Sequence, residues 1–160
     1  MPVKFQDFSF SVKAELDDAA KAWLHTWGDE IASQARDNVQ LDGDEGVQLR
    51  KSYRADVDEK NGVAMIGTPL ESGYWEEYGT GEYAVHGDGR KGWWVWKDGY
   101  KGNGGPMLTE EEAKAIAASD PTLHASNGRP PSYTLETAFT VTKPKAIADA
   151  KSKLKERLDG

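Results

Sequence analysis

The fold of this chain is decided by the stretch Glu71-Ser-Gly-Tyr-Trp-Glu-Glu-Tyr-Gly-Thr-Gly81, which is followed later in the sequence by Gly128-Arg-Pro-Pro131. The first stretch places three aromatic and three acidic side chains directly before two closely spaced glycines. Because glycine adopts positive φ angles without steric cost, Gly79 and Gly81 predict a sharp reversal of the chain at the end of a short helix. Thr80 lies between them, and its hydroxyl is expected to hydrogen-bond backbone groups left open at this corner.

A long amphipathic helix is predicted upstream of the corner. Apolar residues recur every three or four positions from Leu16 to Ala35, which indicates a helix over about residues 15–40 with one buried face. Gly28 lies inside this helix and costs about 1 kcal/mol relative to alanine, so we expect it to mark a close packing contact.

A second long helix is predicted downstream, from about Leu135 to Leu158. Pro144 either kinks this helix or starts a separate one at the first helical position, which proline favours. The predicted apolar face consists of Ala138, Phe139, Ile147, Ala150, Leu154 and Leu158.

A β-hairpin is predicted between the first helix and the corner. Residues 47–57 alternate in part between apolar and polar side chains and predict its first strand, and residues 63–68 predict the second. Asn61-Gly62 lies between them and indicates a type I′ turn, in which both central residues have positive φ. A short strand or extended arm is also expected within residues 2–12.

A segment rich in glycine and tryptophan separates the two motifs. Residues 92–97 predict a strand, and residues 109–118 predict a short helix whose first turn contains a capping box. A structureless loop of this length is unusual in a compact domain, so residues 82–130 are expected to form an insertion or flap. We therefore expect a single α+β domain over residues 1–160, in which a small antiparallel sheet built on a long hairpin packs against the two long helices.

Composition limits the class of protein. The chain has 160 residues, with six tryptophans and six tyrosines, which is enough for one aromatic-rich core. It has no cysteine, which excludes disulfides and thiol chemistry. No apolar run approaches the roughly 20 residues of a membrane span, and the N-terminus lacks the apolar segment of a signal peptide. We expect a soluble protein that is not secreted and has no membrane partner.

The net charge of −7 is unevenly distributed along the chain. Residues 15–45 contain nine carboxylates against two bases, whereas residues 143–160 contain six bases, including Lys151, Lys153 and Lys155, against three carboxylates. Specific nucleic-acid binding is not expected, because an acidic protein with one basic helix lacks a concentrated basic face. The two segments are either solvated helix faces or opposite patches that meet between copies of the protein.

Catalytic and metal-binding motifs are weak in this sequence. Glu76 and Glu77 resemble the carboxylate pair of a glycosidase, but adjacent helix residues point about 100° apart, and the simpler interpretation is a pair of solvated helix carboxylates. His86 and Asp88 could ligate a metal, but no second histidine is spaced to complete the site. Residues 99–105 resemble a phosphate-binding loop only faintly, because no strand leads into them. We expect no enzymatic activity, no metal and no cofactor.

Trp93, Trp94 and Trp96 form the densest aromatic cluster. Such a cluster most often lines a small core, but it can also form an interface between proteins or a platform that stacks on sugars or bases. A Trp-rich glycan-binding module or a glycoside-acting enzyme is therefore the alternative to a structural protein.

The order of these segments resembles a known family. The long helix, the hairpin, the two motifs and the closing helix are similar to the tail-component family of long-tailed bacteriophages, also called neck or tail-completion proteins. The family's blocks read Gly-x-Leu-x-x-Ser, then Tyr-x-x-x-Val-Glu-Phe-Gly-Thr-Gly, then Arg-Pro-x-Pro-Phe-Leu-x-Pro-Ala. The residues that resemble these blocks are Gly46, Leu49 and Ser52, then Tyr74, Glu77, Tyr78, Gly79, Thr80 and Gly81, then Arg129, Pro130, Tyr133, Leu135 and Ala138. The departures are one extra residue in the first block, Glu76 for valine, Tyr133 for phenylalanine, and a larger insertion.

The resemblance implies a non-enzymatic virion protein at the phage head–tail junction that works as a ring of identical subunits, such as a hexamer. It implies as partners other copies of the chain, the connector or head-completion proteins, and tail proteins, and it implies assembly in the host cytoplasm. The residues expected to serve structure or interaction are Glu77, Tyr78, Gly79, Thr80, Gly81, Trp93, Trp94, Trp96, Arg129, Pro130, Lys151, Lys153 and Lys155. We expect the acidic segment of one copy to face the basic helix of the next, with tryptophans supplying buried area.

Overall fold

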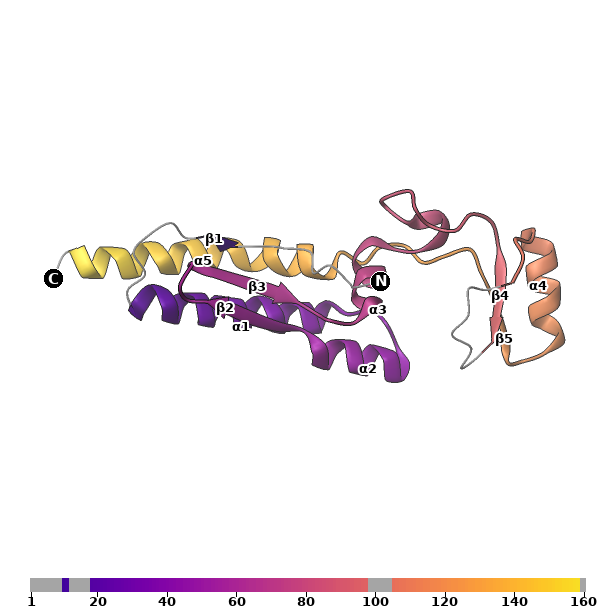
Figure 1. Cartoon of the computed structure of the whole chain (residues 1–160), viewed down its shortest axis with the longest axis horizontal. Helices are drawn as coiled ribbons and strands as arrows, with labels where there is room; N and C mark the ends of the chain where they lie inside the picture. Colours follow the sequence, from indigo (N-terminus) through magenta and orange to yellow (C-terminus); the bar gives the residue numbers. More distant parts are fainter. Residues whose placement is uncertain (1–9, 12–17, 98–104, 159–160) are drawn as a thin grey trace. The chain divides into compact units, whose positions relative to one another are not determined.

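The computed structural model of the chain describes residues 10–11, 18–97 and 105–158. Within these residues the elements follow in the order β1 (Phe10–Ser11), α1 (Asp18–Asn38), α2 (Gly43–Ser52), β2 (Arg54–Asp58), β3 (Val63–Gly67), α3 (Glu71–Tyr78), the 3-10 helix η1 (Gly81–Tyr83), β4 (Trp94–Lys97), α4 (Glu110–Ser119), β5 (Leu123–Ser126) and α5 (Thr134–Leu158) (Figure 1). The fold is α+β, as predicted.

Residue contacts divide the chain into two compact units. Unit 1 combines Met1–Glu77 with Ser132–Gly160, and unit 2 consists of Tyr78–Pro131. The chain therefore leaves unit 1 at the end of α3 and returns to it just before α5. The single domain over residues 1–160 with an insertion at about residues 82–130 stays a prediction.

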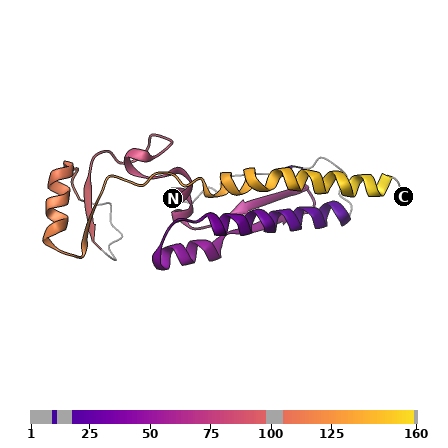
Figure 2. The same cartoon turned by 180° about the vertical axis from the view of Figure 1, so that it is seen from behind.

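Unit 1 is built on a small antiparallel sheet with the strand order β1-β3-β2. Helix α1 packs against β2, β3 and α5. The two long helices run side by side in both views of the fold (Figure 1 and Figure 2). The amphipathic pattern of α1 is confirmed, because its tryptophans and Ile31 are buried.

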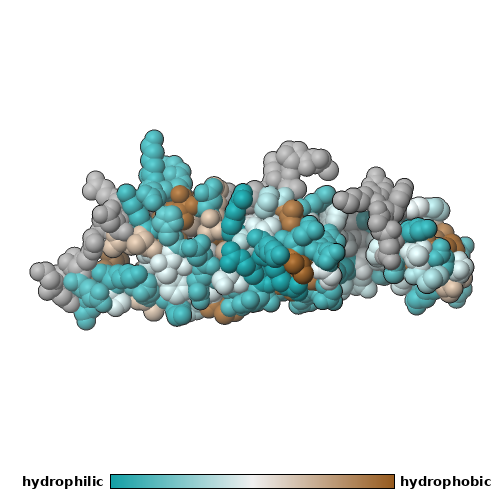
Figure 3. Space-filling model, turned by 90° about the horizontal axis from the view of Figure 1, so that it is seen from below, coloured by the Kyte–Doolittle hydropathy of each residue, from teal (hydrophilic) through white to brown (hydrophobic). Residues whose placement is uncertain are grey.

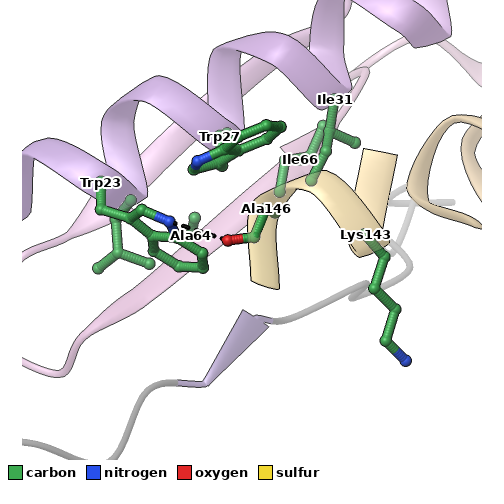
Figure 4. Close-up of a pocket in the computed structure, with 9 residues that line it drawn as sticks. Trp23, Trp27, Ile31, Ala64, Ile66, Lys143 and Ala146 are labelled. Atoms are coloured by element: carbon green, nitrogen blue, oxygen red, sulfur yellow. Dashed lines mark hydrogen bonds between the residues drawn. The ribbon is translucent and has the colours of Figure 1, made fainter. Parts of the chain in front are cut away.

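The core of unit 1 forms where α1, β3 and α5 meet (Figure 4). Trp23 and Trp27 of α1 face Ala64 and Ile66 of β3 and Ala146 of α5, and these five side chains belong to one buried cluster. The indole N–H of Trp23 also donates a hydrogen bond to the carbonyl oxygen of Ala146 at 3.2 Å. The small side chain of Ala146 leaves room for the bulky indole rings, so the large residues of α1 fill the space between the helices.

Residues 47–52 form the second half of α2, so the prediction that they begin a strand is wrong. The helix carries acidic residues in its first turn and basic residues in its last turn, which suits the helix dipole. Leu49 lies on its inner face and is completely buried. The alternation in this segment was only partial, and helical burial of a single leucine accounts for the pattern without a strand.

The hairpin of β2 and β3 is present, but its turn differs from the predicted one. Asp58 pairs with Val63, so the loop contains the four residues Glu59–Gly62. Gly62 has a φ of 66°, whereas Asn61 does not have positive φ. Asp58 accepts hydrogen bonds from the backbone and side-chain amides of Asn61, at 3.0 and 2.6 Å, and this folds the loop locally. The predicted type I′ turn is therefore wrong.

Helix α5 continues through Pro144 as one helix, which decides between the two predicted alternatives. Its predicted apolar face is only partly right. Ala138 is buried, and Phe139 and Ala150 pack against the core while partly buried, but Ile147 and Leu154 are 37% and 64% exposed. The side chain of Leu158 lies outside the described residues. The inner face of α5 thus combines small residues, such as Ala146 beside the tryptophans of α1, with Leu135, and the larger aliphatic side chains of Ile147 and Leu154 remain on the outside.

Unit 2 contains a two-stranded antiparallel sheet of β4 and β5, with α4 packed against β5. The predicted strand and helix are confirmed. Thr109 and Glu112 form the predicted capping box, since the backbone N–H of each donates to the side chain of the other. Among the described residues of unit 2, Ala113 is the one hydrophobic side chain that is buried.

No helix in the described part of the chain is both long and apolar enough to cross a membrane. On the face shown in Figure 3, hydrophilic residues dominate and hydrophobic residues form small, separate patches.

Gly28 makes the close contact that the sequence predicts, and it provides a test of the packing of α1 on the sheet. A Cβ atom at this position would lie 2.9 Å from the Cβ of Ala55. We expect Gly28→Ala to lower the free energy of unfolding by about 1 kcal/mol, because overpacking outweighs the roughly 1 kcal/mol gained in helix propensity. Chemical denaturation of Gly28→Ala, Ala55→Gly and the double variant measures this. The double variant should show favourable coupling, and simple additivity would contradict the explanation.

Candidate functional site

The side chain of Glu77 holds the first turn of α5. Its two carboxylate oxygens accept hydrogen bonds from the backbone N–H groups of Leu135 and Glu136, at 2.7 and 3.0 Å. These N–H groups belong to the first turn of α5 and have no carbonyl partner within the helix. A negative charge at this position is also favoured by the helix dipole. Glu77 therefore caps a helix that begins far away in the sequence.

Glu76 performs a similar task at the neighbouring end of α1, whose last residue, Asn38, also donates a hydrogen bond to the carbonyl oxygen of Thr134 at the start of α5. Its Oε1 atom accepts a hydrogen bond of 2.6 Å from the backbone N–H of Gln40, just after α1 ends. The same exit is fixed by Arg50, which donates to the carbonyl oxygens of Val39 and Leu41. Both glutamates are only 2% exposed, so the interpretation of Glu76 and Glu77 as solvated helix carboxylates is wrong.

These contacts converge on one buried polar junction, which we define as Tyr53, Glu76, Glu77 and Thr134. Tyr53 and Thr134 are completely buried. Burial, together with the nearby charges of Glu77 and Glu76, raises the pKa of Tyr53 well above its ordinary value. Burial is also the largest cause of the raised pKa of Glu77, although the two backbone hydrogen bonds oppose it. The junction keeps carboxylates away from water while it connects the end of α1 to the start of α5.

The residue before α5 explains why a distant carboxylate is needed. Tyr133 occupies the position where a capping serine, threonine, aspartate or asparagine is preferred, and a tyrosine cannot fill that role. Its φ of 48° is also uncommon for a residue other than glycine. The hydroxyl of Thr134 has no hydrogen-bond partner and does not cap the helix either. Glu77 supplies from α3 what the local sequence lacks.

The glycines of the corner allow two chain segments to cross at the base of unit 2. Thr80 and Arg129 are joined by two hydrogen bonds, from the Thr80 N–H to the Arg129 carbonyl oxygen at 2.9 Å and from the Arg129 N–H to the Thr80 hydroxyl at 3.0 Å. A Cβ atom on Gly81 would lie 2.2 Å from the carbonyl oxygen of Asn127, and one on Gly128 would lie 2.1 Å from that of Thr80. Gly79, Gly81 and Gly128 all have positive φ. The predicted role of Thr80 and the predicted reversal are confirmed.

The first block of the family resemblance also has a structural explanation. Gly46 lies where a Cβ atom would meet the carbonyl oxygen of Leu41 at 1.9 Å, and Leu49 is completely buried. The hydroxyl of Ser52 donates to the Leu49 carbonyl oxygen at 2.7 Å and lies 2.5 Å from the hydroxyl of Thr68. These residues fasten α2 to the chain on both sides of it.

The three tryptophans of unit 2 do not form one cluster. Trp94 and Trp96 lie on the same face of β4, while Trp93 points to the opposite face, because side chains alternate along a strand. Trp96 is 40% exposed and stacks on His124, with 4.5 Å between ring centroids. The guanidinium of Arg90 lies over Trp94, and the ammonium of Lys114 lies over Trp93.

The three lysines of α5 differ in their surroundings. Lys153 lies 3.1 Å from the carboxylate of Asp149, which also accepts a 3.0 Å hydrogen bond from the indole N–H of Trp27. The Trp27 bond, and then the Lys153 bond, lower the pKa of Asp149. Lys151 and Lys155 are exposed. Lys153 therefore belongs to the contact between α1 and α5, and the acidic and basic helices pack against each other within one chain.

The arrangement offers little for catalysis. The two adjacent glutamates bind backbone N–H groups on different elements instead of facing a common substrate. His86 packs against Tyr78, with 4.7 Å between ring centroids. The described residues contain no group of three or more histidine, cysteine or carboxylate side chains placed to hold a metal ion.

The importance of the buried glutamates can be tested with stability measurements. We expect Glu77→Ala to lower the free energy of unfolding by about 2 kcal/mol, because two backbone N–H groups lose a charged acceptor. Glu71→Ala is the matched control, since Glu71 is exposed in the first turn of the same helix, and its effect should stay within about 0.5 kcal/mol. Equal effects of the two substitutions in chemical denaturation would show that Glu77 does not hold α5.

A pH dependence follows from the raised pKa of Glu77. A carboxyl group whose pKa is higher in the folded state binds its proton more tightly when folded, so the free energy of unfolding falls as pH rises from the ordinary pKa of 4.5 through the raised value. Glu77→Gln does not titrate. The stability of the natural protein relative to Glu77→Gln should therefore fall as pH increases through this window. A difference that does not change with pH would contradict burial as the dominant cause.

Comparison with known proteins agrees with these observations. Residues 4–79 match the model of the family HK97-gp10_like, described as "Bacteriophage HK97-gp10, putative tail-component". No curated protein and no solved structure matches the chain. The match contains the first block, both buried glutamates and Gly79, while the Arg129–Ala138 block lies outside it. The family's description indicates a phage tail component, which supports a structural role, rather than an enzymatic one, and a place in the virion. Residues 4–79 thus carry the signature of the bacteriophage tail-component family that the ordered motifs resemble.

Proposed function

We propose that this protein is a ring-forming connector at the phage head–tail junction, where it completes the tail or joins it to the head. The observation that carries this proposal is the match of residues 4–79 to a phage tail-component family. The motif residues in that match serve structure: Glu77 caps α5, and Leu49 is completely buried. A chain whose characteristic residues hold helices in place suits an assembly part better than an enzyme.

The proposed partners are other copies of this chain and the neighbouring connector, head-completion and tail proteins. The division of the chain supports such a role, since unit 1 contains the whole buried hydrophobic cluster of the described residues. Unit 2 presents half-exposed aromatic side chains such as Trp96 and Tyr83 instead. Aromatic side chains of this kind are typical anchors of protein interfaces.

The alternative of a glycan-binding module rests on Trp94 and Trp96. One side of each ring system is already occupied, by Arg90 and His124 respectively. The glycoside-acting enzyme loses its support, because Glu76 and Glu77 are buried and bound to backbone N–H groups. We therefore favour the structural role.

The proposal can be tested in the phage that encodes this protein. Deleting the gene should leave filled heads and free tails that do not join, and a plasmid copy should restore infectious particles. Electron microscopy of the lysate and mass spectrometry of purified particles provide the measurements. Joined particles without the protein, or absence of the protein from restored particles, would contradict the proposal.

Two glycine variants make this test sharper. Gly81→Ala should fail to restore joining, because its Cβ atom would collide with the Asn127 backbone at the base of unit 2. Gly87→Ala is the control, since Gly87 has a similar positive φ but nothing lies within 4 Å of the added atom. If both variants restore joining equally, the crossing of the two segments is not needed for function.

A further inference from the structure

The outer face of α5 combines exposed aliphatic and basic side chains. Ile147, Lys151, Leu154 and Lys155 are spaced as i, i+4, i+7 and i+8, so they lie on one face of the helix. All four are exposed, with Leu154 at 64%. We call these four residues the basic face. Aliphatic side chains exposed beside lysines on a helix are typical of a surface that docks on an acidic partner.

The other three lysines of α5 have partners within unit 1. Lys143 lies over the ring of Phe139, Lys145 lies over Trp27, and Lys153 pairs with Asp149. Among the described residues, no ion pair involves Lys151 or Lys155. The charge of the basic face is therefore directed outward.

The outer face of α1 has the complementary chemistry. Thr26, Asp29, Glu30, Ser33 and Asp37 follow the spacing i, i+3, i+4, i+7 and i+11, and all five are exposed. We call these residues the acidic face. It presents three carboxylates, and no ion pair to them occurs among the described residues. Its threonine and serine side chains are short, which leaves room for longer side chains to approach.

The two faces cannot meet within one chain. Other residues join the two helices within a chain: Trp23 bonds to Ala146 and Trp27 bonds to Asp149. The acidic and basic faces therefore point away from the contact that joins the two helices. A chain that carries two complementary outward faces can pair each of them only with another molecule.

We infer that the basic face of α5 docks on the acidic face of α1 in a second copy of this chain. This inference rests on the proposed function and specifies its self-contact. Because the contact joins one face to a different face, it repeats from copy to copy and generates a ring when the rotation closes. Exposed ion pairs contribute only about 0–1 kcal/mol each, so the contact is weak and salt-dependent in isolated protein. It directs the orientation of neighbouring copies during assembly.

Cross-linking provides the direct test, because the chain has no natural cysteine. A variant with both Ser33→Cys and Ile147→Cys is treated with a short bismaleimide, as concentrated purified protein and within particles. The double variant should give a ladder of dimers, trimers and larger species, whereas each single variant should stay monomeric. A pair of Asp56→Cys and Ile147→Cys, both exposed, serves as the control and should give no ladder.

Charge exchange provides the second measurement. Lys151→Glu with Lys155→Glu should abolish the ladder, and adding Asp29→Lys with Asp37→Lys should restore it. The same charge change at Lys51 and Lys60, both exposed on other elements, should leave the ladder unchanged. Lys153 is left intact, because it takes part in the internal contact with Asp149.

Each result has a definite meaning. Dimers from a single-cysteine variant would show a two-fold contact and overturn the inference. Cross-links from Ile147→Cys to a different phage protein would also overturn it. So would the absence of a ladder both in concentrated protein and within particles. Failure of the contact is distinguishable from failure of the proposed function. If purified protein gives the ladder but heads and tails still join after the gene is deleted, the contact is retained and the proposed function is rejected. If no ladder forms but heads and tails fail to join after the deletion, the proposed function is retained and the contact is rejected.

Discussion

The structure of unit 1 depends on two neighbouring carboxylates that are buried and directed to different backbones. Glu76 holds the exit of α1 at Gln40, and Glu77 holds the entry of α5 at Leu135 and Glu136. Burying a carboxylate is costly unless it is hydrogen-bonded, and here each one replaces lost water with backbone N–H groups. The short helix α3 thereby fixes where both long helices begin or end, which is the condition for their tryptophan and alanine faces to meet.

This constraint accounts for the composition of the contact between the long helices. Glu76 and Glu77 of α3 hold the ends of α1 and α5. Inside the contact between the two helices, the indole N–H groups of Trp23 and Trp27 donate the hydrogen bonds that join one helix to the other. Small residues of α5 such as Ala146 accept the indole rings, Leu135 of the same helix is also buried, and Ile147 and Leu154 lie on the outer surface. Asp149 and Lys153 of α5 take part in this contact, whereas Lys151 and Lys155 are exposed.

The sequence predicted the elements that local physics determines. Periodic apolar residues predicted α1, the capping box predicted α4, and the paired glycines predicted the reversal after α3. Prediction from the sequence failed where contacts between distant residues determine the local structure. Partial alternation over residues 47–52 was mistaken for a strand, because only the tertiary position of Leu49 shows that a helix buries it. The capping role of Glu77 was also missed, although a signal existed: Tyr133 precedes α5 and cannot cap it, so another residue had to.

The positions at which the chain leaves unit 1 and returns to it have an evolutionary consequence. The backbone N–H of Ser132 donates to the carbonyl oxygen of Glu76 at 2.8 Å, so the points at which the chain leaves and re-enters unit 1 are adjacent. A segment whose ends are already neighbours can be lengthened, shortened or exchanged with little change in the entropy of closing the loop. Genetic recombination between related phages could therefore replace the region between α3 and α5 while the helices and the sheet of unit 1 stay as they are.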